Sequence, residues 1–133
     1  NPFLKDLAWF CPYDLDVDKM NAAAQLLFDH TDFTSFSRSK TQTKTNNCKI
    51  LHAHWEEAGE ELVFHISADR FLRNMVRAIV GTLLDVGMGK MKPEEINNVI
   101  KSKSRSEAGV SVPAKGLYLT KVLYPQDIFD EQE

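Results

Sequence analysis

Residues 70–87 read RFLRNMVRAIVGTLLDVG, and this stretch combines a long apolar run with three arginines. At about 100° per residue, its apolar side chains cover more than half of a helical circumference, which is typical of a helix buried on most sides. Gly87 and Gly89 close the run and favour a helix end there. The stretch therefore predicts a buried helix over residues 70–87.

The polar part of this predicted helix is narrow. Arg73, Arg77 and Gly81 follow one another at i, i+4 and i+8, so they would share one strip of the helix surface. Glycine has no side chain, and another segment can therefore approach the backbone at Gly81. We expect a close contact there, beside two guanidinium groups.

Shorter patterns on both sides of the helix predict the remaining elements. They are a strand at residues 7–11, a helix at 18–30 capped by Asp16 or Asp18, a hairpin of strands at 49–55 and 62–67, a helix from Pro93 and a strand at 117–124. The order β-α-β-β-α-(α)-β is that of an α+β ferredoxin-like sandwich, with an antiparallel sheet and helices on one face.

The hairpin alternates, so its two faces can be assigned. The face predicted to meet the core carries Leu51, Ala53, Trp55, Leu62, Phe64 and Ile66. The opposite face carries Ile50, His52, His54, Val63 and His65. Three histidines on one face are potential zinc ligands. However, a half-polar sheet face explains them without a metal, and no carboxylate that would orient the imidazole rings is evident. We therefore predict no metal site and leave the role of His52, His54 and His65 open.

Length and composition limit the possible classes. The chain has 133 residues, 43% of them hydrophobic, which suits a single domain over residues 1–133. Two widely spaced cysteines suit a reducing cytoplasm, and no apolar run reaches the ~20 residues of a membrane span. The net charge of −3 argues against a uniformly basic nucleic-acid binder. Charge is segregated, however: residues 37–49 hold only basic charges, and residues 126–133 form an acidic tail.

Three motifs carry a more specific signal: DFTSFS at residues 32–37, FLRNMVRAIVGTLLDVGMGK at 71–90 and PAKGLYLTKVLYP at 113–125. In order and spacing they resemble the C-terminal half of the tRNA pseudouridine synthase A family. The resemblance implies one half of a pseudouridine synthase fold, from an isomerase that converts uridine to pseudouridine in the anticodon stem-loop of tRNA. It also implies tRNA as a partner, a homodimer and no cofactor.

The resemblance further implies roles for two residues. Arg77, in the family's MVR string, would pair with the catalytic aspartate and keep that carboxylate ionised. Leu117, in GLYL, would pack against the target uracil. From composition alone, Arg77 would be a solvated surface arginine and Leu117 a core leucine. Further candidates for RNA contact, with ordinary solvated charge as the alternative, are Arg38, Lys40, Lys44, Arg70 and Arg73.

One departure from the family pattern affects activity. The family's catalytic aspartate lies in a Gly-Arg-Thr-Asp-Ala-Gly-Val string of the N-terminal half, and residues 1–133 contain no such string. We therefore expect the N-terminal catalytic half to be absent from this chain and the chain to be inactive alone. The alternative function is a non-catalytic ferredoxin-like RNA-binding module.

Overall fold

The computed structural model describes residues 3–9, 15–37, 46–59, 61–112 and 118–119. Its strands are β1 (Phe3–Trp9), β2 (Ile50–Ala58), β3 (Glu61–Ala68) and β4 (Tyr118–Leu119). They form a sheet in the order β2-β3-β1-β4, in which each pair of neighbours is antiparallel. β1 and β2 therefore run parallel to each other with β3 between them, which is the split βαβ arrangement.

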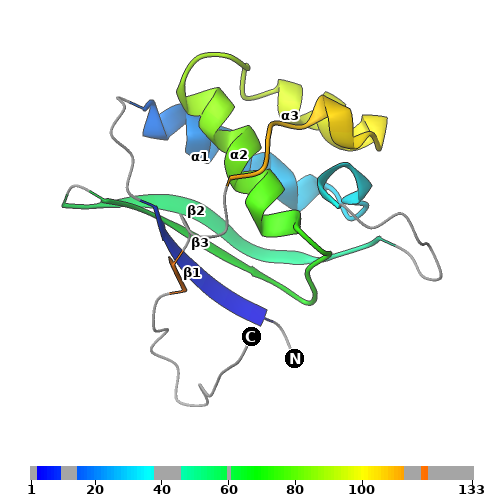
Figure 1. The fold of residues 1–133 in the computed structure, drawn as a ribbon, viewed down its shortest axis with the longest axis horizontal. Helices are drawn as coiled ribbons and strands as arrows, with labels where there is room; N and C mark the ends of the chain where they lie inside the picture. The colour runs from blue at the N-terminus through cyan, green and yellow to red at the C-terminus, as the bar shows by residue number, and fades with distance from the viewer. Residues whose placement is uncertain (1–2, 10–14, 38–45, 60, 113–117, 120–133) are drawn as a thin grey trace.

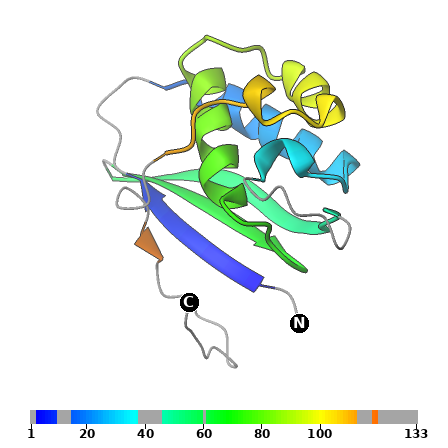
Figure 2. The same cartoon turned by 45° about the vertical axis from the view of Figure 1, so that its right-hand side comes forward.

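Three helices cover one face of this sheet (Figure 1). They are α1 (Val17–Leu26), α2 (Met75–Gly87) and α3 (Glu95–Ser102). The view turned by 45° keeps all three on the same side (Figure 2). The order of elements, the antiparallel sheet and the one-sided helical layer confirm the predicted α+β ferredoxin-like fold.

The core lies between the sheet and α2. All residues of α2 are buried except Arg77 and Asp85, which are half-buried. The apolar side chains of α2 pack with residues from the sheet and from the other helices. The largest fully buried side chains of the whole core are Phe33, Phe36, Phe64, Met20, Leu27, Ile66, Met75, Ile79, Leu83 and Ile96. Trp55 and Phe64 stack across β2 and β3, with ring centroids 4.8 Å apart. Among the described residues, no helix is both long and apolar enough to cross a bilayer.

The helix predicted from residue 70 begins five residues later, at Met75. Asn74 has a left-handed backbone with φ of 70°, which a continuous right-handed helix does not permit. The Met75 N–H donates to the Leu72 carbonyl over 3.0 Å, so a turn precedes the helix. Arg70 and Arg73 therefore lie outside α2, and the predicted strip of Arg73, Arg77 and Gly81 was wrong in its first member. The strip on α2 consists of Arg77, Gly81 and Asp85.

The hairpin faces were predicted correctly except at the start of β2. Ile50 pairs with Ala68 and His52 pairs with Ser67, so Leu51 is an extra residue in a β-bulge. The bulge reverses the alternation before it: Ile50 is 6% exposed and belongs to the core, whereas Leu51 is 37% exposed. Because Ile50 and Leu51 are both apolar, the sequence alone did not show which of them faces the core.

Other boundaries moved by a few residues. β1 begins at Phe3 instead of Leu7, and residues 10 and 11 lie outside the described part. The Asp16 carboxylate accepts a hydrogen bond from the Lys19 N–H over 3.1 Å and so caps α1, which ends at Leu26 and continues as a 3₁₀ turn, Leu27–Asp29. α3 begins at Glu95, two residues after Pro93.

Candidate functional site

The segment of residues 109–112 lies along the polar strip of α2, from Thr82 to Arg77. A Cβ at Gly81 would lie 1.8 Å from the Val110 carbonyl oxygen, and one at Gly109 would lie 2.9 Å from the Thr82 Cα. Both distances are shorter than van der Waals contact, so both positions require glycine as the two backbones now lie. The close approach expected at Gly81 is thus made by the backbone of residues 109–112.

Polar contacts hold this segment against α2. The Gly109 N–H donates to the Thr82 hydroxyl over 2.8 Å, and that hydroxyl donates to the Ala78 carbonyl over 2.8 Å. At the other end of the segment, the Val112 N–H donates to the Arg77 carbonyl over 3.2 Å. Residues 109–112 therefore run antiparallel to α2 and end beside Arg77.

Arg77 is half-buried, and its side chain meets the same residue that its carbonyl binds. Its Nε donates to the Val112 carbonyl over 2.8 Å. Among the described residues, no acidic side chain lies within ion-pair distance of the Arg77 guanidinium. The arginine is therefore directed by a neutral carbonyl, and its two Nη groups remain available to a carboxylate from outside the described residues.

Two more side chains, those of Asn74 and Arg105, bind residues 109–112 close to Arg77. The Ser111 hydroxyl oxygen accepts hydrogen bonds from Asn74 Nδ2 over 2.7 Å and from Arg105 Nη2 over 2.6 Å. Arg105 Nη1 also donates to the Gly109 carbonyl over 2.9 Å. We call Asn74, Arg77, Arg105, Ser111 and Val112 the Arg77 cluster.

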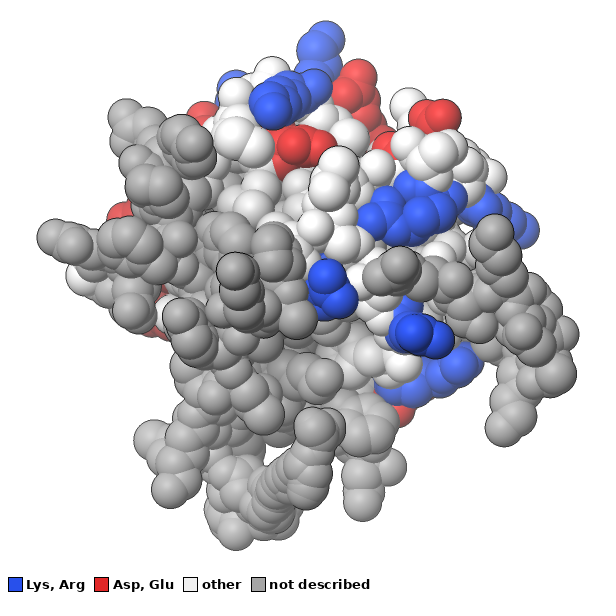
Figure 3. All heavy atoms as spheres, in the orientation of Figure 1, with Lys and Arg blue, Asp and Glu red and all other residues white. Residues whose placement is uncertain are grey.

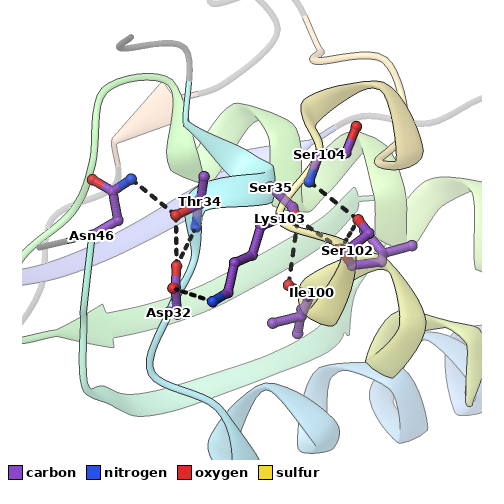
Figure 4. Close-up of polar contacts among 9 residues, drawn as sticks. Asp32, Thr34, Ser35, Asn46, Ile100, Ser102, Lys103 and Ser104 are labelled. Atoms are coloured by element: carbon purple, nitrogen blue, oxygen red, sulfur yellow. Dashed lines mark hydrogen bonds and ion pairs between the residues drawn. The ribbon is translucent and has the colours of Figure 1, made fainter. Parts of the chain in front are cut away.

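The DFTSFS motif forms a second cluster, beside the end of α3 (Figure 4). Asp32 Oδ1 accepts from the Thr34 N–H over 3.1 Å and from the Thr34 hydroxyl over 2.6 Å. Asp32 Oδ2 lies 3.6 Å from Lys103 Nζ, and Asn46 Nδ2 donates to the Thr34 hydroxyl oxygen over 2.9 Å. We call Asp32, Thr34, Asn46 and Lys103 the Asp32 cluster. Ser35 donates to the Val99 carbonyl over 2.6 Å and so attaches the motif to α3.

The pKa values of two carboxyl groups, Asp32 in the Asp32 cluster and Asp85 on α2, are shifted in opposite directions. Burial alone would raise the pKa of Asp32, but the hydrogen bonds from Thr34 and the charge of Lys103 outweigh it and hold that pKa below its usual value. Burial raises the pKa of Asp85, although the charge of Lys90 opposes the change. Asp32 is thus stabilised as a carboxylate, and its charge is compensated within its own cluster.

Of the basic residues expected to contact RNA, the structure describes Arg70 and Arg73. Arg70 Nη1 donates to the Asn47 carbonyl over 3.2 Å, and Arg73 is exposed. Arg38, Lys40 and Lys44 lie outside the described residues, as does Leu117. In the view of Figure 3, lysine and arginine side chains gather on the right half of the molecule, with few acidic side chains between them. The roles predicted for these residues remain predictions.

The described histidines do not build a metal centre. His54 and His65 stack with ring centroids 4.7 Å apart, and His65 Nε2 lies 2.9 Å from Glu56 Oε1. In the part of the chain that the structure describes, no three His, Cys, Asp or Glu side chains are grouped to hold a metal ion. Cys48 is buried, and burial raises its pKa to about 11, so its thiol stays protonated near neutral pH.

Sequence reasoning did not find Asn74, Arg105, Ser111 or Val112. Gly81 signalled a close approach, but nothing local to it indicated which segment would approach. Gly109 could have indicated that segment, because a second glycine in a polar connection allows its backbone to lie close to α2. The partners of Arg77 were determined by the path of residues 109–112 across α2.

The chain is similar in sequence to known tRNA pseudouridine synthases. The family model described as tRNA pseudouridine synthase matches residues 23–125. The tRNA pseudouridine synthase A of Parabacteroides distasonis is 51% identical over 133 residues, which are all of this chain and 53% of that protein. The Bacteroides fragilis protein of the same name is 51% identical over 130 residues, 97% of this chain and 52% of the relative. The one from Bacillus licheniformis is 43% identical over 122 residues, 92% of this chain and 49% of the relative.

These matches place the chain in a class of proteins named as tRNA pseudouridine synthases. The chain belongs to the tRNA pseudouridine synthase family, which confirms the resemblance drawn from its motifs. The relatives quoted above are all named as the A type of synthase. The chain spans about half the length of the curated relatives it matches.

Proposed function

We propose that residues 1–133 form one domain, the C-terminal domain of a tRNA pseudouridine synthase, with residues 126–133 as its acidic tail. The complete enzyme isomerises uridine to pseudouridine in the anticodon stem-loop of tRNA. The observation that supports this most is the state of Arg77, which is half-buried, directed by the Val112 carbonyl and unpaired with any acid of the described residues. That state suits an arginine whose carboxylate partner is supplied by another part of the complete enzyme.

The chemistry explains why such a pair is needed. The isomerisation breaks the bond between N1 of uracil and C1′ of the ribose, forms a bond from C5 to C1′, and exchanges the proton on C5 for one on N1. A carboxylate that attacks or deprotonates has to remain charged in a partly dry cleft, and a fixed guanidinium stabilises its charged form. The reaction is redox-neutral, so we propose that it needs no cofactor.

The substrate must also be gripped. A base inside a stem-loop has to be extruded to reach a carboxylate, at a cost of a few kcal/mol. We assign Leu117 to packing against the target uracil. We assign Arg38, Lys40, Lys44, Arg70 and Arg73 to contacts with flanking phosphates, which help to offset the extrusion. The lysine and arginine side chains gathered on the face in Figure 3 support a polyanionic partner on that side.

The partners and location follow from the same assignment. We propose that the complete protein is a homodimer that acts on tRNA in the cytoplasm. The free thiol of Cys48 is consistent with a reducing compartment. The homodimer is supported by the family resemblance.

The test is tritium release from tRNA that carries uridine labelled at C5, because the proton on C5 is lost in the reaction. The complete protein that contains residues 1–133 should release tritium, and the chain of residues 1–133 alone should not. Release by the chain alone would contradict the need for an outside carboxylate. If the complete protein binds tRNA without releasing tritium, the non-catalytic RNA-binding module is the correct function.

A further inference from the structure

The orientation of Arg77 depends on a side-chain bridge that the family assignment does not describe. A guanidinium has five N–H donors, one on Nε and two on each Nη. Because Arg77 Nε donates to the Val112 carbonyl, a carboxylate cannot use the Nε edge of this arginine. It must approach the edge formed by the two Nη groups, where a bidentate pair is possible.

The Val112 carbonyl can direct Arg77 only if residues 109–112 are themselves immobile. Ser111 is the neighbour of Val112, and its hydroxyl oxygen accepts from both Asn74 and Arg105. A hydroxyl oxygen has two lone pairs, so these two donors fill its acceptor capacity. Asn74 precedes α2 and Arg105 lies in the 3₁₀ turn η3 (Arg105–Glu107), so a single hydroxyl joins two elements next to Val112.

The remaining contacts limit motion in other directions. Arg105 also binds the Gly109 carbonyl, so one guanidinium spans residues 109 and 111. At Gly81, the Val110 backbone already touches α2, so residues 109–112 cannot move closer to the helix. Loss of the Ser111 bridge would leave the segment held to α2 by the Gly109 N–H at one end and by the Val112 N–H at the other, without the side-chain hydrogen bonds to Ser111 between them. The Val112 carbonyl would then be less firmly placed beside Arg77.

We propose that Ser111, held by Asn74 and Arg105, is a positioning residue that aims the Nη edge of Arg77 at the incoming carboxylate. This inference rests on the proposed function, because it assigns the bridge to the same pair of charges. Ser111 itself does not touch the reacting groups in this scheme. Its effect reaches the reaction through Val112 and Arg77.

The first test is kinetic and uses the complete enzyme. Ser111→Ala should lower kcat for tritium release about tenfold, which is the effect of one hydrogen bond on an orientation needed in the transition state. KM for tRNA should change less than about twofold, because Ser111 is not assigned to the RNA surface. Ser106→Ala is the matched control: its hydroxyl pairs with Ser104 in the same turn, without a link to Arg77, and it should leave both constants unchanged.

The second test reports on Arg77 without using activity. In the complete enzyme labelled with ¹⁵N-arginine, the Nε–H signal of Arg77 is identified by its loss in Arg77→Lys. Its exchange with water should be slow in the unmodified protein and at least about fivefold faster in Ser111→Ala, because the Val112 carbonyl would no longer hold it. Ser106→Ala should leave this exchange rate unchanged.

A second variant covers the case in which Ser111→Ala fails to fold. Asn74→Gly retains a residue that tolerates the left-handed backbone at φ of 70° and removes one of the two donors to Ser111. Because Arg105 still holds the hydroxyl, kcat should fall, but by less than tenfold, and KM should change less than about twofold.

The outcomes separate the two proposals. Faster Nε–H exchange together with lower kcat supports the positioning role. Unchanged exchange, or faster exchange with unchanged kcat, overturns it even if the enzyme is a synthase. If the unmodified protein releases no tritium, the proposed function fails, whereas the exchange rates still show whether Ser111 holds Arg77.

Discussion

The Asp32 cluster and the Arg77 cluster both join segments that are distant in sequence, yet they treat charge differently. In the Asp32 cluster, the carboxylate accepts two hydrogen bonds from Thr34 and pairs with Lys103. In the Arg77 cluster, the Arg77 guanidinium meets a backbone carbonyl that carries no formal charge. The Asp32 cluster neutralises its charge locally, whereas the half-buried Arg77 guanidinium has no acidic partner among the described residues.

We expect this difference to separate a structural cluster from a functional one. A locally paired carboxylate fixes the connection between the DFTSFS motif and α3 and needs nothing further. A cation taken partly out of water is costly unless an anion accompanies it. The Arg77 cluster is therefore the one that we expect to be completed by another part of the enzyme, and the following substitutions test this distinction.

Replacement of Arg77 should have the largest effect. In the complete enzyme, Arg77→Ala should lower kcat/KM for tritium release at least about a hundredfold, because separation of a partly buried charge pair costs about 3 to 5 kcal/mol. The isolated chain should remain folded, because within the described residues the arginine side chain contributes one hydrogen bond, worth about 1 kcal/mol.

Thermal unfolding of the isolated chain checks the second half of that prediction. Lys92→Ala removes an exposed positive charge and is the control for charge loss alone. A large drop in the melting temperature for Arg77→Ala, without one for Lys92→Ala, would make Arg77 a structural residue like those of the Asp32 cluster.

Gly81→Ala should have an intermediate effect by displacing the segment that directs Arg77. Its Cβ would meet the Val110 carbonyl oxygen at 1.8 Å, so residues 109–112 would have to move. We expect a loss of about 2 kcal/mol in the free energy of unfolding, since overpacking of this kind outweighs the better helix propensity of alanine.

Urea denaturation measures this loss, with Gly87→Ala as a control in the same helix. There the new Cβ would meet side-chain atoms of Met20, the nearest at 2.5 Å, and no backbone atom as close, so the loss should be smaller. Equal losses in the two variants would show that residues 109–112 adapt easily and do not hold Arg77 rigidly.

The smallest expected effect is a pH dependence of the Asp32 cluster. Because the pKa of Asp32 is lowered in the folded state, its stabilising contribution is present above the unfolded pKa of about 4 and is lost as the pH falls through the folded value. Asp32→Asn should therefore flatten the decline of the unfolding free energy below about pH 4. The change should be modest, since the carboxylate is partly exposed and screened by solvent.

Urea titrations between pH 2.5 and 6 measure that slope, within roughly the range over which carboxyl groups titrate. Lys103→Met should remove part of the same slope, because the charge of Lys103 lowers the pKa of Asp32. A slope that is unchanged in both variants would mean that the ionised carboxylate of Asp32 does not stabilise the folded state.

The order and type of the elements were predictable because they depend on local patterns. Alternation in the hairpin and the apolar run after Met75 each follow from the chain's own periodicity. The bulge at Leu51 and the late start of α2 were not predictable in this way. The first depends on how β2 pairs with β3, and the second on a left-handed turn at Asn74 that apolar periodicity does not reveal.

In the candidate site too, the features that depend on local sequence were predictable and the contacts between distant segments were not. Arg77 was identified by its motif and Gly81 by its place on the helix, both from the sequence. The α+β order, the buried helix, the family and the motif that contains Arg77 could all be recognised from local patterns in the chain. Three contacts became apparent only in the folded molecule: residues 109–112 lie against α2, Val112 directs Arg77, and Ser111 joins Asn74 to Arg105. The reason is physical: periodicity reports which side of an element is apolar, whereas a polar contact between distant segments depends on the path of the whole chain.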